Sequence, residues 1–95
     1  MNVTNNTRNQ QFEVLLDGQL AVLQYRLREN RMYFMHTGVP KAIAGQGVAS
    51  ALAKTGLEYA RAQGLRIVVY CPYVRAYLQR HPAYHDLTDQ DLTDQ

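Results

Sequence analysis

Apolar and polar positions alternate along the first third of the chain, with the two-residue period of β-strands that bury one face. Three β-type runs stand there, at residues 12–16, 20–27 and 32–37, and the second shows the period most clearly, with Ala21, Leu23, Tyr25 and Leu27 on one face and Gln24, Arg26 and Arg28 on the other. Asp17-Gly18, between the first two runs, favours a tight hairpin turn. The pattern therefore predicts a meander of three antiparallel strands.

The period lengthens to that of a helix in the middle of the chain. Between residues 48 and 62, apolar side chains recur every three or four positions, and Gly64 then stops the run. Residues 65–71 are nearly all apolar and β-branched, as expected of a strand buried on both faces beside a parallel neighbour. Pro72 begins a second, shorter helix, which Pro82 closes.

The element order β-β-β-α-β-α predicts one α/β (α+β) domain, with a mostly antiparallel, twisted sheet and one parallel crossover. The third strand, the long helix and the fourth strand form that crossover, which we expect to be right-handed. Such a connection places the N-terminus of the long helix at the carboxyl edge of the sheet, where open α/β folds bind ligands.

Composition narrows the functional classes. The chain has 95 residues, no stretch of about 20 apolar residues and a single cysteine, so we expect a small soluble cytoplasmic protein with no membrane contact. Before Asp86, ten Lys and Arg residues stand against four acids. A basic body attracts anions. The arginines are dispersed, with no dense run or RNA-binding motif, so a small polyanionic cofactor fits at least as well as nucleic acid.

The two ends of the chain are polar. Residues 1–10 are rich in asparagine, and we predict that they are disordered. Residues 86–90 are repeated as residues 91–95. We therefore predict a mobile acidic tail at residues 88–95 and a folded domain at residues 11–87. The aspartates lack the spacing and the turn glycine of a calcium loop, so no metal site is predicted.

The junction between loop and long helix carries the strongest functional signal. Gly45 and Gly47 stand directly before the helix. Glycines let the backbone approach an anion closely, and the free N–H groups of a helix's first turn point at that anion. The alternative is that the two glycines only mark the passage from loop to helix.

Three blocks of residues resemble the GNAT superfamily of acetyl-CoA-dependent N-acetyltransferases, in particular its small single-domain members. The blocks are His-Thr-Gly-Val-Pro at residues 36–40, Gly-Gln-Gly-Val-Ala at residues 45–49, and Cys-Pro-Tyr-Val-Arg-Ala-Tyr-Leu-Gln-Arg-His-Pro at residues 71–82. They occur in the family's order and spacing, and the resemblance runs from about Phe12 to Leu87.

The resemblance implies acetyl-CoA or CoA as the cofactor, with its pyrophosphate on the glycine turn and its pantetheine arm along the strand that ends at Val39. The implied cofactor-binding residues are Val39, Gly45, Gln46, Gly47, Val48, Ala49 and Ser50. The thioester is then expected between the ends of residues 36–39 and 69–71.

The sequence departs from the family pattern at three positions. The superfamily usually has Arg or Gln where this chain has Ala44. The small members commonly have Glu where this chain has Gly38 and Ala83. The missing carboxylate at position 38 weakens the case for catalysis more than the case for cofactor binding, because a base must lie within reach of the amine.

Three residues are candidates for catalysis, each with a structural alternative. Cys71 ends the buried strand just ahead of a helix N-terminus. In the functional interpretation it carries the acetyl group or lines the cofactor site with its thiol. In the structural interpretation it is a small buried apolar residue. The resemblance places a proton-donating tyrosine near Tyr77, for which core packing is the alternative. His36 is the best remaining base, since an imidazole titrates close to neutral pH, or else a strand-end histidine.

Three functions remain open at the level of sequence. The first is an acetyl-CoA-dependent N-acetyltransferase that acts on a small amine or on a peptide or protein amine by direct transfer in a ternary complex. The second is a CoA-binding or protein-interaction module without catalytic activity, and the third is a nucleic-acid-binding domain. The sequence does not identify the amine acceptor.

Overall fold

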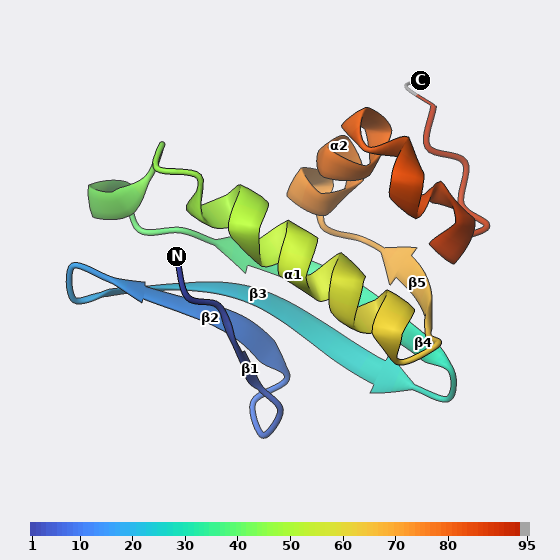
Figure 1. Cartoon of the computed structure of the whole chain (residues 1–95), viewed down its shortest axis with the longest axis horizontal. Coiled ribbons are helices and arrows are strands. Elements are labelled where there is room, and N and C mark those ends of the chain that lie inside the picture. Colours follow the sequence, from blue (N-terminus) through green and yellow to red (C-terminus); the bar gives the residue numbers. More distant parts are fainter. Residues whose placement is uncertain (94–95) are drawn as a thin grey trace.

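The computed structural model describes residues 1–93, which form one five-stranded sheet with the helices on one face (Figure 1). The strands are β1 (Thr4–Asn6), β2 (Gln11–Leu16), β3 (Gln19–Arg28), β4 (Arg31–Gly38) and β5 (Arg66–Val69). The helical elements are α1 (Val48–Ala62), α2 (Pro72–Arg80) and the 3-10 helices η1 (Lys41–Ile43) and η2 (Pro82–Leu87).

The strands lie in chain order across the sheet. Neighbours are antiparallel from β1 to β4, and β5 pairs with β4 in parallel after α1 has crossed the sheet. The predicted α/β (α+β) fold with one parallel crossover is confirmed. No helix within residues 1–93 is both long enough and apolar enough to span a bilayer.

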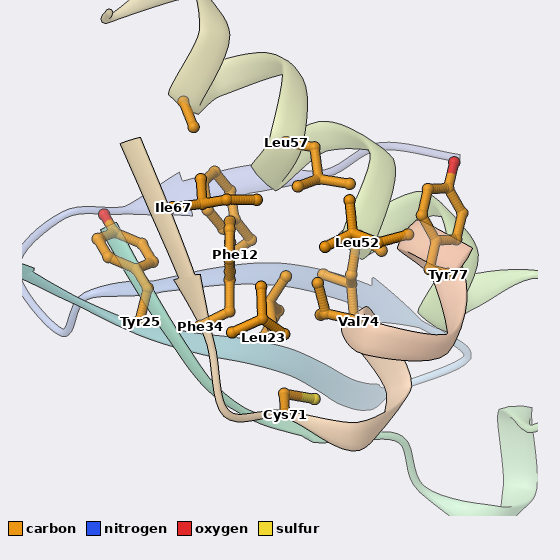
Figure 2. Close-up of a cluster of buried hydrophobic side chains, with 14 of the residues drawn as sticks. Phe12, Leu23, Tyr25, Phe34, Leu52, Leu57, Ile67, Cys71, Val74 and Tyr77 are labelled. Carbon is orange, nitrogen blue, oxygen red and sulfur yellow. The ribbon is translucent and has the colours of Figure 1, made fainter. Parts of the chain in front are cut away.

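Helix α1 packs its apolar face on the inner face of the sheet, and Figure 2 shows side chains from both layers meeting there. Phe12, Leu23 and Phe34 from the strands are fully buried, as is Leu57 from the helix. Gly56 allows the close approach, because a Cβ atom at this position would lie 2.9 Å from the Phe34 ring. The core therefore fixes the position of α1 against β4.

Strand β4 contains a bulge that changes which residues face the helices. Tyr25 pairs with Phe34 and Gln24 pairs with His36, so Met35 is an extra residue in β4. A Cβ atom at Gly38 would lie 3.5 Å from His36 Nε2 and 3.8 Å from Val22 Cγ2, which places these residues on the outer face, away from the helices.

Strands β4 and β5 separate immediately after this bulge. Their parallel pairing ends at Phe34 and Val69. The backbone N–H groups of Tyr70 and Cys71 both donate to the Phe34 carbonyl, at 2.9 and 3.1 Å, and the chain then turns into α2. Beyond this point the end of β4 and the start of α2 diverge, and Val39 and Tyr73 line a common cleft there. We call the space between the end of β4 and the start of α2 the opening.

The N-terminal segment is ordered, and the prediction of disorder at residues 1–10 was wrong for this part. Strand β1 pairs with β2 at the sheet edge. Asn5 Oδ1 accepts a hydrogen bond of 2.7 Å from the Tyr25 hydroxyl, and Asn6 Nδ2 donates to Glu13 at 2.9 Å. Composition misled here because an edge strand is held by hydrogen bonds from polar side chains and buries little apolar surface.

Residues 88–93 of the acidic tail are held against β5 and α2, contrary to the prediction of a mobile segment at residues 88–95. The Gln90 side-chain amide accepts from the Val69 N–H at 2.6 Å and donates to the Val69 carbonyl at 3.2 Å, so it pairs with the free edge of β5. Arg66 binds Asp89 at 2.6 Å, and Arg75 donates to the Asp91 carbonyl. Residues 94–95 lie outside the described residues.

Candidate functional site

The turn before α1 is shaped by two glycines in the left-handed region. Gly45 has φ 81° and Gly47, the N-cap of α1, has φ 79°. Space is open where a Cβ atom of either residue would lie, so the backbone conformation is what demands glycine. The turn therefore leaves its backbone exposed at the entrance to the helix.

The first amides of α1 lack a cap. No side chain caps the helix at Gly47, and the first backbone hydrogen bond runs from the Ala51 N–H to the Gly47 carbonyl at 3.0 Å. The N–H groups of residues 48–50 therefore have no acceptor within the helix. The first turn contains no acidic residue, so the helix dipole there is not neutralised.

These amides open into a cleft of about 290 Å³ between α1, the end of β4 and α2. Its lining residues are Val39, Ala44, Gly45, Gly47, Val48, Ala49, Ser50 and Tyr73. Six of the seven predicted cofactor-binding residues thus line one cleft, and Gln46 is exposed outside its wall. Tyr73 was not singled out from sequence, although it lies in the block of residues 71–82.

The donor set of this cleft fits a phosphate anion. Uncapped amides at the positive end of a 15-residue helix bind anions without help from side chains. The open space above Gly45 and Gly47 admits an anion close to the backbone. The side chain that Ala44 does not supply is therefore not essential to this arrangement.

Cys71 lies at the start of α2, where β4 and β5 have separated. Its Sγ atom is 3.0 Å from Thr37 Oγ1, and the residue is only 2% exposed. Two residues further along, Val39 and Tyr73 line the cleft. The Thr37–Cys71 contact therefore closes the inner end of the opening, and it makes the thiol poorly accessible.

His36 lies at the same level of β4 but on the opposite face of the sheet. The residue is exposed, and its imidazole lies beside the bare backbone of Gly38. The bulge at Met35 causes this orientation, because it turns His36 outward and Thr37 inward. His36 is thus not grouped with Cys71 and Tyr77, and it borders the opening from the outer face.

Tyr77 belongs to α2, is only 4% exposed and faces α1. Its ring stacks on His81 with centroids 3.8 Å apart. Burial raises the pKa of Tyr77, and a hydrogen bond with the Ser50 side chain opposes this rise. Figure 2 shows the Tyr77 hydroxyl pointing away from Cys71. Tyr77 therefore contacts the helix turn that lines the cleft, and does not itself form the cleft wall.

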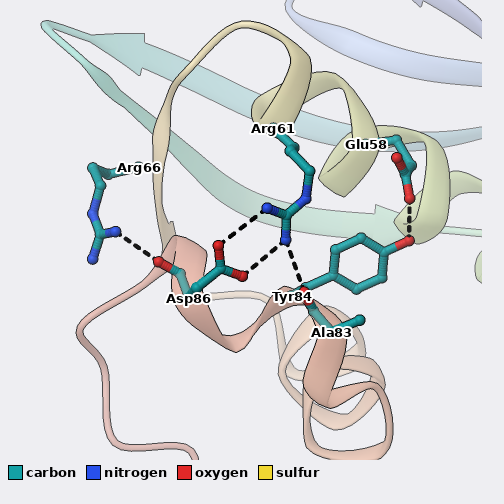
Figure 3. A network of polar contacts seen from close by, with 6 residues as sticks. All are labelled: Glu58, Arg61, Arg66, Ala83, Tyr84 and Asp86. Carbon is teal, nitrogen blue, oxygen red and sulfur yellow. Dashed lines mark hydrogen bonds and ion pairs between the residues drawn. The ribbon is translucent and has the colours of Figure 1, made fainter.

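The C-terminal half of α1 is tied to η2 by a polar network (Figure 3). Arg61 forms an ion pair of 2.8 Å with Asp86 and donates to the Ala83 carbonyl at 2.8 Å. The Tyr84 hydroxyl donates to Glu58, and this hydrogen bond is the main reason that the pKa of Tyr84 is raised to about 12. Ala83 thus contributes its backbone, where the family commonly has a carboxylate.

Known proteins resemble the chain in sequence and in structure. Residues 11–87 match the family described as GCN5-related N-acetyl-transferase. Protein NATD1 from Bos taurus is 36% identical over 83 residues, which cover 84% of this chain and 74% of that protein. A GCN5-like protein from Staphylococcus aureus, solved by NMR, has a TM-score of 0.72 and 29% identity, covering 92% of this chain and 86% of its own.

Proposed function

Because the chain belongs to the GCN5-related N-acetyltransferase family, we propose that it is an acetyl-CoA-dependent N-acetyltransferase. The observation that carries this proposal is the cleft at the start of α1, whose uncapped amides meet two left-handed glycines. Residues 45 and 47–50 would hold the pyrophosphate through their backbone, and Val39 would contact the pantetheine arm. When bound, acetyl-CoA supplies a thioester that acetylates an amine nitrogen, with a new C–N bond, a broken C–S bond and CoA as the leaving thiol.

The acceptor amine must lose a proton, and His36 is the residue that we assign to receive it. Its imidazole is exposed at the opening between β4 and α2, on the face that a substrate reaches from solvent. Gly38 leaves room beside the ring. A base acts only within hydrogen-bond reach of the amine or through one water molecule, which an exposed imidazole at this edge allows.

Direct transfer in a ternary complex fits the burial of Cys71 better than an acetylated cysteine does. The thiol is 2% exposed and contacts Thr37, so an attack by sulfur requires this contact to open. We assign Cys71 to the closed end of the opening, and Tyr77 to holding Ser50 and the first turn of α1 in place. Proton donation to the leaving thiolate is the alternative role for Tyr77.

A CoA-binding module without catalysis is the second candidate function. The observation that favours it is the absence of a carboxylate at Gly38 and Ala83, which leaves His36 as the base that we assign within residues 1–93. The two candidates differ in one measurable property, which is release of CoA from acetyl-CoA when amines are supplied.

Calorimetry with CoA, followed by a CoA-release assay over polyamines, amino acids and peptides, tests the proposal. We expect binding by the wild type and turnover with at least one amine. His36→Gln should lower kcat/KM by about 100-fold, while CoA binding stays unchanged. Absence of CoA binding would end the proposal, and binding without turnover would favour the second candidate.

The role of the cysteine is tested separately by intact-mass spectrometry after incubation with acetyl-CoA. We expect Cys71→Ser to retain substantial turnover and the wild type to gain no acetyl group. An acetyl adduct that disappears in Cys71→Ala together with turnover would replace direct transfer by a two-step route.

A further inference from the structure

The outer face of the sheet carries an unusual set of exposed apolar side chains. Both long helices lie on the other face (Figure 1). On the outer face, Leu15 is 70% exposed, Leu20 47%, Met35 40% and Tyr70 62%. Leu15 and Leu20 lie together near the turn between β2 and β3, whereas Met35 and Tyr70 lie together where β4 and β5 separate. A contiguous exposed apolar patch marks an interaction surface, and the second pair belongs to such a patch.

One end of this face is hollowed into a cleft of about 440 Å³, separate from the cleft at α1. Its lining residues are Arg26, Leu27, Arg28, Tyr33, Met35 and Tyr70. The rings of Tyr33 and Tyr70 are stacked, with centroids 6.2 Å apart and planes inclined by 19°. We call this the outer cleft.

The outer cleft is positively charged. Arg26 and Arg28 are exposed, and within residues 1–93 neither forms an ion pair with a carboxylate. Arg31 pairs with Arg28 across the hairpin and adds a third cation beside the cleft. The one acid in this hairpin is Glu29, in the turn between the strands. The charge of the cleft therefore complements an anionic ligand.

The outer cleft also adjoins the place where acetyl transfer would occur. Two of its lining residues are Met35, the bulge of β4, and Tyr70, the residue after β5. These are the positions at which β4 and β5 separate. His36 follows Met35 directly on the same face. A ligand in the outer cleft is therefore placed to present an amine at the opening.

We propose that the acceptor is an acidic peptide segment that binds in the outer cleft, an inference that rests on the proposed function. Its carboxylates face Arg26 and Arg28, its apolar or aromatic side chains pack on Tyr33 and Tyr70, and its free amine reaches the opening beside His36. The amine nitrogen gains the acetyl group and loses one proton, and CoA leaves as the thiol. Polyamines and cationic peptides are disfavoured by the arginines.

A peptide fits the outer face better than a nucleic acid does. Arginines beside stacked tyrosines also suit nucleotide bases, but Leu27 and Met35 line the same cleft with aliphatic side chains, which bases and phosphates do not match. The reacting group at the neighbouring opening is an amine, which every peptide N-terminus supplies.

The test uses two hexapeptides that differ only in charge, Ala-Asp-Phe-Glu-Leu-Asp and Ala-Lys-Phe-Arg-Leu-Lys, each with a free N-terminal amine. We expect kcat/KM for the acidic peptide to exceed that for the basic one by about tenfold, since each exposed ion pair contributes modestly. The preference should shrink as salt is raised. A fluorescein-labelled acidic peptide, followed by anisotropy without acetyl-CoA, reports binding independently of catalysis.

The double variant Arg26→Glu/Arg28→Glu reverses the charge of the outer cleft. Its matched control is Arg8→Glu/Lys54→Glu, which changes the net charge equally at exposed residues outside the cleft. We expect the first variant to abolish the preference and to weaken anisotropy binding by about tenfold, with CoA affinity unchanged, and the control to behave like the wild type. Tyr70→Ala should weaken peptide binding and leave CoA affinity unchanged.

The outcomes separate the two proposals. If CoA binds but the peptides are acetylated equally, or the first variant keeps the preference, the assignment of the acceptor is overturned and the proposed function stands. If CoA does not bind, the proposed function fails, and anisotropy still decides whether the outer cleft binds acidic peptide. A labelled oligouridylate that binds more tightly than the peptide and displaces it would also overturn the assignment.

Discussion

A glycine in the left-handed conformation stands at each end of helix α1, Gly47 with φ 79° and Gly64 with φ 68°. The two ends differ in whether the free backbone N–H and C=O groups of the helix find hydrogen-bond partners. At the C-terminal end, the free carbonyl groups accept hydrogen bonds from the following residues. The Gly64 N–H donates to the Arg61 carbonyl at 3.1 Å and the Leu65 N–H donates to the Ala60 carbonyl at 2.9 Å, which together form a Schellman motif. At Gly47 no side chain caps the amides.

This difference separates stability from binding along one helix. The C-terminal end is fixed by its own hydrogen bonds and by the contacts of Arg61 and Glu58 with η2. The N-terminal end keeps its donors directed at a cleft, where solvent or an anionic ligand can satisfy them. Substitutions at the two ends should therefore affect different measurements.

The largest effect is expected from Gly47→Asp, which brings a carboxylate to the site assigned to phosphate. At about 4 Å and an effective dielectric constant of about 20, two like charges repel by about 4 kcal/mol. We therefore expect CoA affinity, measured by calorimetry, to fall by more than about 100-fold.

The control for this prediction is Gly64→Asp, the same change in the same backbone conformation at the other end of α1. It should lower the free energy of unfolding by about 1–2 kcal/mol, because of left-handed strain and an acid at the helix C-terminus. CoA affinity should not change. Equal losses of CoA affinity in the two variants would contradict the division between the ends.

The next effect concerns the middle of α1, where packing joins its two ends. In Gly56→Val the new side chain meets Phe34, since even a Cβ atom would be 2.9 Å from the ring. Overpacking should lower the free energy of unfolding by about 1–3 kcal/mol in urea denaturation. Lys54→Val, on the exposed side of the helix, isolates the cost of a β-branched residue, and an equal loss there would refute the packing explanation.

A smaller effect is expected at the C-terminal end from Tyr84→Phe, which removes the hydrogen bond to Glu58 and should cost about 1–2 kcal/mol. The folded pKa of Tyr84 is about 12 against an ordinary value of 10.0, so this contribution is present below pH 10 and is lost as pH rises through the folded pKa. The stability difference from wild type should shrink above pH 10. Tyr70→Phe, which removes the hydroxyl of an exposed tyrosine, is the control and should leave the free energy of unfolding at neutral pH unchanged.

The smallest effect is expected from Asp86→Asn, at an exposed ion pair. The hydrogen bond from Arg61 holds the pKa of Asp86 below its ordinary value of 3.8. The contribution of this carboxylate to stability is therefore present above that value and is lost as pH falls through the lower, folded pKa. Thermal melts should show a slightly lower Tm for the variant at neutral pH and no difference in strong acid. A difference that persists in acid would assign it to something other than this charge.

Sequence patterns were sufficient to locate an element where one local signal, such as an apolar run, a helical period or a glycine pair, dominates. The β-type runs on either side of Asp17-Gly18 located β2 and β3 to within about one residue, and the helical period located α1. The glycine turn was also accessible, because Gly45 and Gly47 stand directly before a strong helix. The lining of the cleft by residues 45 and 47–50 follows from the chain's local geometry.

Features that depend on pairing between residues far apart in the chain could not be predicted from the sequence. Residues 32–35 are all apolar or aromatic, so the sequence does not mark Met35 as an extra residue in β4, and the bulge alone turns His36 to the outer face. The docked tail depends on one side chain, because Gln90 supplies the hydrogen bonds that a neighbouring strand would give to Val69. Polar composition says nothing about such a pairing.

The central claim is that the uncapped amides at the start of α1 bind the phosphates of CoA, and amide-resolved NMR tests it most directly. In a titration of ¹⁵N-labelled protein with CoA, we predict the largest chemical-shift changes at the amides of residues 45 and 47–50, with smaller changes at Val39 and Tyr73. The amides of residues 61–65, at the other end of the helix, should not move. Changes centred on the outer cleft, or no changes at saturating CoA, would contradict the claim.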